Sequence, residues 1–274
     1  MNSYLIFTDL DGTLLDHQDY RFTEALAALE KIRQARIPLI INSSKTRAEI
    51  ADIRKQLHNN GAFVVENGAA VCVPAGLFPG YDQTVNQVIL GRALTEILPI
   101  IRRLRETHGF SFQGFNDFSV ADVMRETGLN EIQAEQAKQR LASEPLKWRD
   151  SQERLGQFQS LLRQQGLQLI KGGRFWHVMG GNDKSRAMAW LLNKYQQQQQ
   201  RKKLLTIALG DSQNDLRMLE QADYAGVIRK PDGGHLSINK APDRVIYSQH
   251  RAPLGWREVI DQLFSQLNIG EGNE

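Results

Sequence analysis

Two aspartates stand two positions apart directly after the first apolar segment of the chain, in the run Asp9-Leu10-Asp11-Gly12-Thr13. Residues 4–7 are apolar and include β-branched and aromatic side chains, as expected of a strand buried on both faces of a parallel sheet. If the extended backbone continues through Asp9, the carboxylates of Asp9 and Asp11 project to the same side. Carboxylates this close repel each other unless a cation lies between them or one carries a proton. The pair is therefore a candidate nucleophile and general acid, although an Asp-Gly turn after a strand is also common.

A second polar segment, Asn42-Ser43-Ser44-Lys45, follows the apolar residues 38–41. The next four residues, Thr46-Arg47-Ala48-Glu49, form a capping-box pattern, which predicts that a helix begins there. Small hydroxyl residues let the backbone approach a phosphate, and the positive end of the helix would face the same anion. Ser43, the neighbouring amides and the charge of Lys45 could thus hold phosphate oxygens. A serine-rich turn that only caps the helix explains the segment equally well.

Two later segments bring further charged side chains to strand ends or helix starts. In Gly180-Gly181-Asn182-Asp183-Lys184, the lysine stands at the start of a predicted helix, where the helix dipole disfavours a cation unless a negative group is near. The run Gly210-Asp211-Ser212-Gln213-Asn214-Asp215 follows the apolar residues 204–209 and supplies several side-chain oxygens. Oxygen-rich clusters of this kind suit Mg²⁺, which takes one or two carboxylates and keeps several waters.

The scaffold that would bring these four segments together is predicted by the alternation of strand and helix patterns. Strand patterns at 4–7, 38–41 and 62–65 are separated by amphipathic helical segments. This β-α-β-α-β order predicts a parallel sheet, and ligands bind at the carboxyl ends of the strands in such sheets. The same pattern returns after residue 184 with a helix, a strand at 204–209 and a short helix.

Residues 81–183 interrupt this pattern with helix-forming segments and strand-like pieces near 110–112, 145–148 and 175–178. We therefore expect an α/β fold in which a Rossmann-like parallel-sheet core carries an inserted α+β cap domain. The expected domains are a first core part at 1–80, the cap at 81–183 and a second core part at 184–274.

The composition favours a globular protein that acts on a small ligand. Of 274 residues, 41% are hydrophobic and 24% are charged, and no apolar run approaches the roughly 20 residues of a membrane span. The first residues lack the features of a secretory signal, and the single cysteine, Cys72, reads as a packed strand residue. These features predict a cytoplasmic protein without membrane contact. The net charge of +3 is modest and dispersed, so we expect a small anionic substrate rather than nucleic acid. The sequence assigns no oligomeric state.

Together, the four motifs resemble those of the haloacid dehalogenase-like hydrolase superfamily. Asp9-Leu10-Asp11-Gly12-Thr13 resembles its first motif, Ser43 its second, Lys184 its third and residues 210–215 its fourth. A cap inserted between the second and third motifs is similar to the Cof-like branch, whose members mostly remove phosphate from small metabolites. The resemblance extends from residue 4 to about residue 264.

Within that branch the chain is most similar to the mannosyl-3-phosphoglycerate phosphatases. Ser43-Ser44-Lys45-Thr46 stands where other members have a small residue followed by Gly-Arg, and residues 65–69, 148–151 and 174–178 also look like that subfamily. The resemblance implies hydrolysis of mannosyl-3-phosphoglycerate to mannosylglycerate, a compatible solute, and phosphate. The alternatives are another sugar phosphate such as glucosyl-3-phosphoglycerate, a phosphomutase, or, in a different class, a phosphoryl-accepting signalling module.

The resemblance also implies roles for the motif residues. Asp9 would attack phosphorus and form an aspartyl-phosphate, and Asp11 would act as general acid and then as general base. Mg²⁺ would be held by Asp9, the backbone carbonyl of Asp11 and Asp211. Asn214 and Asp215 would act through ordered waters or by orienting the catalytic lysine.

A further set of residues would bind the phosphate or the remainder of the substrate. Lysine and hydroxyl groups of the second and third motifs would hold phosphate oxygens, and arginines of the cap would suit a bidentate contact to a glycerate carboxylate. The segment around Arg174 could equally be a cap strand with alternating core and surface residues. These candidates are Lys184, Ser43, Ser44, Lys45, Asn67, Arg149, Arg174 and His177.

Overall fold

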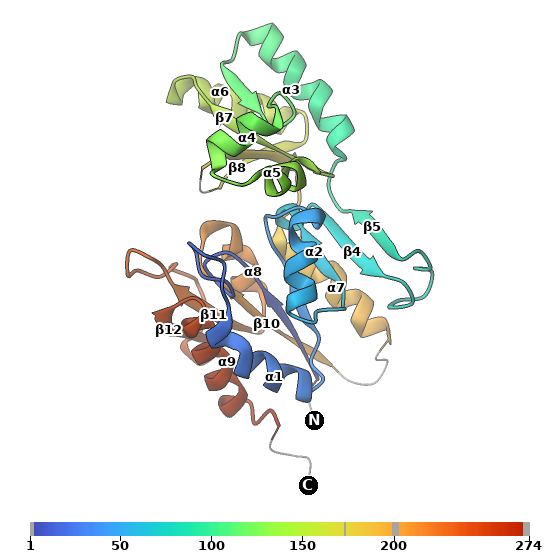
Figure 1. Ribbon diagram of the computed structural model, residues 1–274, viewed down its shortest axis with the longest axis vertical. Coiled ribbons are helices and arrows are strands. Elements are labelled where there is room, and N and C mark those ends of the chain that lie inside the picture. Colours follow the sequence, from blue (N-terminus) through green and yellow to red (C-terminus); the bar gives the residue numbers. More distant parts are fainter. Residues whose placement is uncertain (1–2, 173, 199–202, 271–274) are drawn as a thin grey trace.

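The core of the protein is a five-stranded parallel sheet with the strand order β12-β11-β10-β1-β2 (Figure 1). The computed structural model describes residues 3–172, 174–198 and 203–270. The strands are β1 Ser3–Thr8, β2 Leu39–Ile41, β10 Leu204–Gly210, β11 Tyr224–Arg229 and β12 Val245–Arg251. β1 pairs with β2 on one side and with β10 on the other, so both ends of the chain build one sheet. The predicted α/β class with a parallel core is confirmed.

Helices cover both faces of this sheet, because successive strand residues point to opposite sides. In β1, Ile6 packs in the cluster that contains α1 and α9 residues, whereas Leu5 and Phe7 pack in the cluster that contains α7 and α8 residues. The helices are α1 Leu26–Gln34, α2 Arg47–Gln56, α7 Lys184–Gln198, α8 Leu216–Gln221 and α9 Leu254–Gln266, with short 3₁₀ turns at Thr23–Ala25, Gln213–Asp215 and Pro242–Arg244. The long apolar strands are thus shielded from water on both sides.

The predicted capping box at the start of α2 is present. The Thr46 hydroxyl accepts a hydrogen bond from the Glu49 N–H at 3.2 Å, and the Glu49 carboxylate accepts one from the Thr46 N–H at 2.8 Å. Two of the backbone donors at this helix end are satisfied in this way. The cap fixes the beginning of α2 directly after the Ser43 segment.

The third predicted strand forms, but it does not extend the parallel sheet as the sequence pattern suggested. β3 (Phe63–Val65) forms an antiparallel sheet with β4 (Ala70–Pro74) and β5 (Val85–Ile89), and an isolated parallel bridge between Asn42 and Val64 connects it to the core sheet. The antiparallel pairing of β3 with β4 arises because the 3₁₀ turn Glu66–Gly68, whose residues have positive φ, reverses the chain after β3. Cys72 is buried in β4, as predicted.

The inserted part of the chain contains a four-stranded antiparallel sheet with the order β6-β7-β9-β8. α3 and α6 contribute to one buried cluster with this sheet, and α4 and α5, which lie between β6 and β7 in the sequence, form a second cluster. The elements are α3 Leu94–His108, β6 Phe112–Gly114, α4 Val120–Thr127, α5 Glu131–Lys138, β7 Ser143–Trp148, α6 Gln152–Gln164, β8 Leu167–Lys171 and β9 Trp176–Gly180. This sheet and its helices are the cap, and β8 is the strand that the sequence pattern did not indicate.

The cap forms a lobe of its own beside the core (Figure 1). Its two connections lie side by side, since a side chain on Gly180 would lie 2.7 Å from the Arg92 nitrogen. β5 follows the predicted limit at residue 80 but pairs with β4 before it. The limits 1–80, 81–183 and 184–274 stay a prediction.

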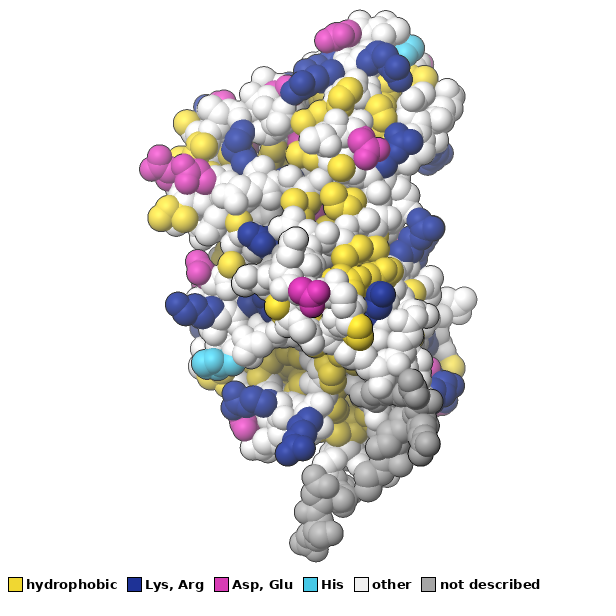
Figure 2. Space-filling view, turned by 90° about the vertical axis from the view of Figure 1, so that its right-hand side faces the viewer, with side chains coloured by type: hydrophobic (Ala, Val, Ile, Leu, Met, Phe, Trp, Pro, Cys, Tyr) yellow, Lys and Arg dark blue, Asp and Glu magenta, His cyan; other side chains and the backbone are white. Residues whose placement is uncertain are grey.

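The surface of one face shows scattered charge. Figure 2 shows lysine and arginine side chains distributed singly over this face from the cap to the core. In the part of the chain that the structure describes, no helix combines the length and the apolar character needed to cross a membrane.

Candidate active site

The predicted motifs meet at the carboxyl-terminal edge of the core sheet. Asp9 follows β1, Asp211 follows the adjacent strand β10, and Asn42 follows β2 on the other side. Backbone hydrogen bonds extend the pairing past the strand ends, from the Asp9 N–H to the Leu209 carbonyl and from the Asn42 N–H to the Thr8 carbonyl. The first turn of α7 adds Lys184 to this edge.

Lys184 is the centre of the polar cluster. Its Nζ lies 2.7 Å from Asp9 Oδ1 and 2.6 Å from Asp215 Oδ1, and the residue is 1% exposed. Burial alone would lower the pKa of Lys184, but the Asp215 and Asp9 carboxylates outweigh burial and raise it. The lysine therefore stays charged, and the unfavourable position of a cation at a helix start is offset by two carboxylates.

Asp215 holds the turn of the fourth motif in place. Its second oxygen, Oδ2, accepts hydrogen bonds from the N–H groups of Asp211 and Ser212 at 3.2 and 3.0 Å. With Oδ1 bound to Lys184, both oxygens of this carboxylate are engaged. Asp215 thus contacts both Lys184 and the backbone of the turn, and the two roles expected of it stay a prediction.

Asp211 projects from that turn toward the first motif. Its Oδ1 accepts a hydrogen bond from the Thr13 hydroxyl at 3.0 Å, and Gly12 leaves just enough room, since a side chain there would lie 3.0 Å from Asp211 Oδ2. Burial and the nearby Asp215 charge raise the pKa of Asp211 to about 6, although the Thr13 hydrogen bond opposes this. Thr13 belongs to the first motif, but nothing in the sequence pattern indicates its hydrogen bond to Asp211.

The carboxylates have the composition of a magnesium site. Oxygen atoms of Asp9, Asp211 and Asp215 lie within 4.8 Å of one another. Burial and the three neighbouring carboxylates raise the pKa of Asp9, despite the opposing charge of Lys184. Asp11 Oδ1 is buried without a hydrogen-bond partner in the described part of the chain. A hard cation with oxygen ligands would offset the repulsion among these carboxylates, and the unpartnered Asp11 Oδ1 stays free for proton transfer. Since Asp215 is fully engaged, Asp9 and Asp211 are the side chains left to hold it.

The Ser43 segment lies beside this cluster. Ser43 is fully buried, and its N–H and carbonyl bond to the Val64 carbonyl and the Asn67 N–H. Asn67 Oδ1 in turn accepts a hydrogen bond from Asn214 Nδ2 at 2.9 Å. The predicted residues Ser43, Asn67 and Asn214 are therefore connected to one another.

Lys45 extends this group toward the first motif. Its Nζ lies 3.1 Å from Asp11 Oδ2 and 4.6 Å from the centre of the Tyr20 ring. Burial works against the charge of Lys45, but Asp11 and Glu49 raise its pKa overall. The Ser44 carbonyl points to the cap, where it accepts a hydrogen bond from Arg140 Nη2.

The predicted cap residues are not brought to the cluster. Arg149 follows the outer end of β7 and Arg174 precedes β9 at the same end; both are exposed, and Arg174 donates to the Thr127 carbonyl. His177 is half-buried on β9, where loss of solvent and the charge of Arg140 lower its pKa to about 3. Its Nδ1 is buried without a partner among the described residues.

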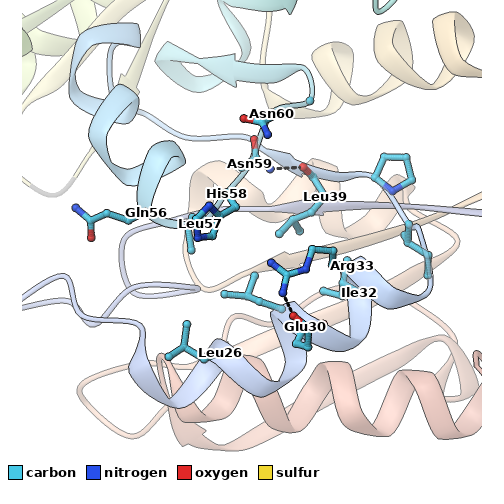
Figure 3. Close-up of a pocket in the computed structure, with 14 residues that line it drawn as sticks. Leu26, Glu30, Ile32, Arg33, Leu39, Gln56, Leu57, His58, Asn59 and Asn60 are labelled. Atoms are coloured by element: carbon cyan, nitrogen blue, oxygen red, sulfur yellow. Dashed lines mark hydrogen bonds and ion pairs between the residues drawn. The ribbon is translucent and has the colours of Figure 1, made fainter.

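A cavity of about 450 Å³ lies at the opposite end of the core sheet. Figure 3 shows its lining by α1, by the end of α2 and by Leu39 at the start of β2. The catalytic candidates follow the carboxyl ends of the strands, so this cavity is separate from them.

Comparisons with known proteins agree with the fold and the motifs. The family described as haloacid dehalogenase-like hydrolase matches residues 6–230. A phosphatase of that superfamily from Bacteroides thetaiotaomicron is 16% identical, with a TM-score of 0.66 over 97% of this chain and 95% of that chain. The sucrose-phosphatase of Synechocystis, solved with sucrose and phosphate, is 15% identical, with a TM-score of 0.59 over 96% and 98%. A sugar phosphatase of subclass IIB is 14% identical, with a TM-score of 0.62 over 97% and 100%. Since the family match spans most of the sequence, the chain belongs to the haloacid dehalogenase-like hydrolase family.

Proposed function

We propose that this protein is a Mg²⁺-dependent phosphatase that hydrolyses phosphate monoesters of small sugars through an aspartyl-phosphate on Asp9. The observation that carries the proposal is the contact of Lys184 with Asp9 at 2.7 Å, next to Asp11 and Asp211 at one sheet edge. A carboxylate nucleophile, a fixed cation and a second carboxylate are the groups that transfer of a phosphoryl group to and from a protein side chain requires.

In the first step a carboxylate oxygen of Asp9 attacks phosphorus, and the bond from phosphorus to the sugar or glycerate oxygen breaks. Lys184 engages Asp9 Oδ1 and is held on its other side by Asp215. This contact fixes the direction of the nucleophile before substrate binds. The lysine charge also balances the negative charge that the phosphoryl group brings into a buried site.

Asp11 transfers the protons in both half-reactions. It gives a proton to the departing oxygen, and it then takes a proton from the water that attacks the phosphorus of the aspartyl-phosphate, which restores Asp9 and releases phosphate. Lys45, at 3.1 Å from Asp11 Oδ2, sets the position of this carboxylate between the first and second motifs.

Asp9 and Asp211 would hold Mg²⁺, with the backbone carbonyl of Asp11 as the proposed third ligand. The ion would screen the repulsion between the anionic nucleophile and the anionic phosphate. The demand for such screening is large, because uncatalysed hydrolysis of phosphate monoesters is among the slowest reactions known. Ser43 and Lys184 are the proposed ligands of the phosphate oxygens.

For the substrate, we propose mannosyl-3-phosphoglycerate. The support is the sequence likeness of residues 43–46, 65–69, 148–151 and 174–178 to the phosphatases that act on it. Two structural neighbours, named as a sucrose-phosphatase and a sugar phosphatase, agree with a phosphorylated sugar as the class. The product, mannosylglycerate, is a compatible solute, so the proposed location is the cytoplasm.

The test is the release of inorganic phosphate from mannosyl-3-phosphoglycerate by the purified protein, with Mg²⁺ and after its removal by a chelator. Glucosyl-3-phosphoglycerate, sucrose phosphate and hexose phosphates are the comparison substrates. We expect the highest kcat/KM for the mannosyl compound and loss of turnover without Mg²⁺. Faster turnover of another member of the panel would replace the substrate, and no phosphate release from any member would overturn the phosphatase.

A further inference from the structure

The carboxylate of Glu66 reaches from the core into the cap. Glu66 is fully buried, and its Oε1 accepts a hydrogen bond from the Leu141 N–H at 2.7 Å. Its Oε2 accepts two more, from the Ala142 N–H at 3.1 Å and from the Ser143 hydroxyl at 2.7 Å. Ser143 is the first residue of β7, a strand paired on both sides in the cap sheet. One core side chain therefore holds the beginning of this cap strand by three hydrogen bonds.

The same part of the cap contacts the second motif. The Arg140 side chain is 5% exposed; its Nη2 donates to the Ser44 carbonyl at 3.1 Å and its Nε donates to the Ser143 hydroxyl at 3.0 Å. The Thr46 hydroxyl donates to the Gln136 carbonyl at 2.9 Å. We call residues 136–143 the docking segment. It lies on the core loop that contains the proposed phosphate ligand Ser43.

Glu66 stands in an unusual backbone turn. In Glu66–Gly68, φ is 53°, 56° and 89°, so two residues with side chains adopt the left-handed region. Such residues cost roughly 1–3 kcal/mol each and persist where the surrounding structure fixes them. Here the N–H groups of Glu66 and Asn67 donate to the carbonyls of Lys45 and Ser43 at 3.0 and 2.9 Å.

The turn also touches the third and fourth motifs. The Asn67 side chain binds Asn214, and a side chain on Gly68 would lie 2.1 Å from the Asp183 carbonyl oxygen. Gly68 therefore packs directly against the backbone that begins α7 and carries Lys184. The turn is in contact with the second, third and fourth motifs and, through Glu66, with the cap.

We propose that Glu66 is a positioning residue that holds the cap in place on the core. We also propose that the Glu66–Gly68 turn couples the position of the cap to the positions of the groups around the phosphate. The role of those groups rests on the proposed function. When the docking segment moves away, Glu66 loses its three donors, and the turn that fixes Ser43 and Asn67 loses a constraint. Proper seating of the cap and an ordered phosphate site thereby depend on each other.

The first test is amide hydrogen exchange of the full chain, compared between the unaltered protein and Glu66→Gln. The variant keeps the size of the side chain but replaces one acceptor oxygen with a donor. We expect exchange at Leu141 and Ala142 to rise about tenfold or more, the change expected for the loss of roughly 1.4 kcal/mol of local stability, with β1 and β10 unaffected. Unchanged exchange in the docking segment, or an equal rise in the core strands, would overturn the proposal.

Glu258 offers a matched control. Its carboxylate also accepts hydrogen bonds from two consecutive backbone N–H groups, those of Gln249 and His250, but within the core. Glu258→Gln should leave exchange in the docking segment unchanged. If Glu66→Gln does not fold, Ser143→Ala removes one of the three donors and should still raise exchange at Ala142 by a smaller factor. No change there would count against the proposal.

The second test compares two substrates in steady state. Acetyl phosphate has a small leaving group that needs no cap, whereas a phosphorylated sugar must be held by it. Glu66→Gln should lower the ratio of kcat/KM for the sugar ester to that for acetyl phosphate by about tenfold or more, because small displacements of bound groups have large kinetic effects. Glu258→Gln should leave the ratio within about twofold. An equal loss for both substrates would overturn the role of Glu66 in seating the cap, and an unchanged kcat/KM for acetyl phosphate would overturn the link from the Glu66–Gly68 turn to the phosphate site. If the unaltered protein hydrolyses no sugar phosphate, the proposed substrate class fails, while the exchange result still decides the role of Glu66.

Discussion

The catalytic candidates of the core are connected to one another by hydrogen bonds and ion pairs, whereas the two arginine candidates of the cap are exposed. In the core, Lys184 contacts Asp9 and Asp215, and Asp215 holds the turn that presents Asp211. In the cap, Arg149 and Arg174 are exposed at the outer end of the sheet. In the account proposed above, the chemistry depends on the connected side chains at the strand ends, and the cap contributes through its contacts with the core.

The largest effect is expected from the nucleophile. Asp9→Asn should lower kcat by roughly 10⁴-fold or more, as removal of a nucleophile does in other enzymes. Because burial and the neighbouring carboxylates raise the pKa of Asp9, loss of the charge should not lower the melting temperature. Phosphate release and thermal unfolding measure the two outcomes. Retention of more than a few per cent of the activity would remove Asp9 from this role.

The next largest effect is expected at Lys184. Lys184→Met leaves two buried carboxylates without their partner, so we expect a loss of about 3–5 kcal/mol in unfolding free energy and a marked loss of kcat. The double variant Lys184→Met with Asp215→Asn removes one of these charges and should regain part of the stability but no activity. Denaturant unfolding with a parallel assay separates the two effects. Recovery of activity in the double variant would show that Lys184 is only structural.

A smaller effect concerns a buried carboxylate of the cap. Burial raises the pKa of Glu144 to about 7, against the opposing hydrogen bond from the Asn116 N–H. Between about pH 4.5 and pH 7 the folded protein thus keeps a proton that the unfolded chain has released. The stability that this proton contributes is fully present below about pH 4.5 and is lost as the pH rises through about 7. Glu144→Gln should therefore be more stable than the unaltered protein at pH 8, by roughly 1–3 kcal/mol, and equally stable at pH 4.5. Melting curves at both values test this, and a constant difference across pH would contradict it.

The smallest effect is expected from the exposed arginines. Arg149→Ala and Arg174→Ala should each change KM for the sugar phosphate by less than about twofold, since exposed side chains away from the site have small effects. A rise of about tenfold in KM with kcat unchanged would mean that the cap moves these guanidinium groups onto the substrate. Steady-state kinetics of the two variants would in that case support the substrate contact that the sequence suggested for these arginines.

The sequence predicted the position of those site residues that directly follow a recognisable strand. Asp9 and Asp211 follow buried apolar strands, so their place at the sheet edge follows from the strand pattern alone. The antiparallel pairing of β3 with β4 did not follow, because the chain reverses at Glu66 and Asn67, whose left-handed φ values only the folded surroundings impose. The role of Glu66 was equally hidden, since its three donors lie 75 to 77 positions away in the sequence.

The cap shows the same limit in another form. Arg174 and His177 stand three positions apart, yet Arg174 is exposed at the outer end of the sheet and His177 is half-buried on β9. Alternation along a strand predicts opposite faces, but which face meets the substrate depends on how the cap packs on the core. The signal that marks the docking segment is tertiary, namely the contacts of Arg140 and Ser143 with core residues.

The most direct test of the central claim is mass spectrometry of the peptide that contains Asp9 after rapid acid quenching during turnover. The account predicts that this peptide carries one phosphoryl group, that the modification is removed by hydroxylamine as an acyl phosphate should be, and that it disappears when the substrate is exhausted. Steady release of phosphate without any modified Asp9, or a phosphoryl group on another residue, would contradict it.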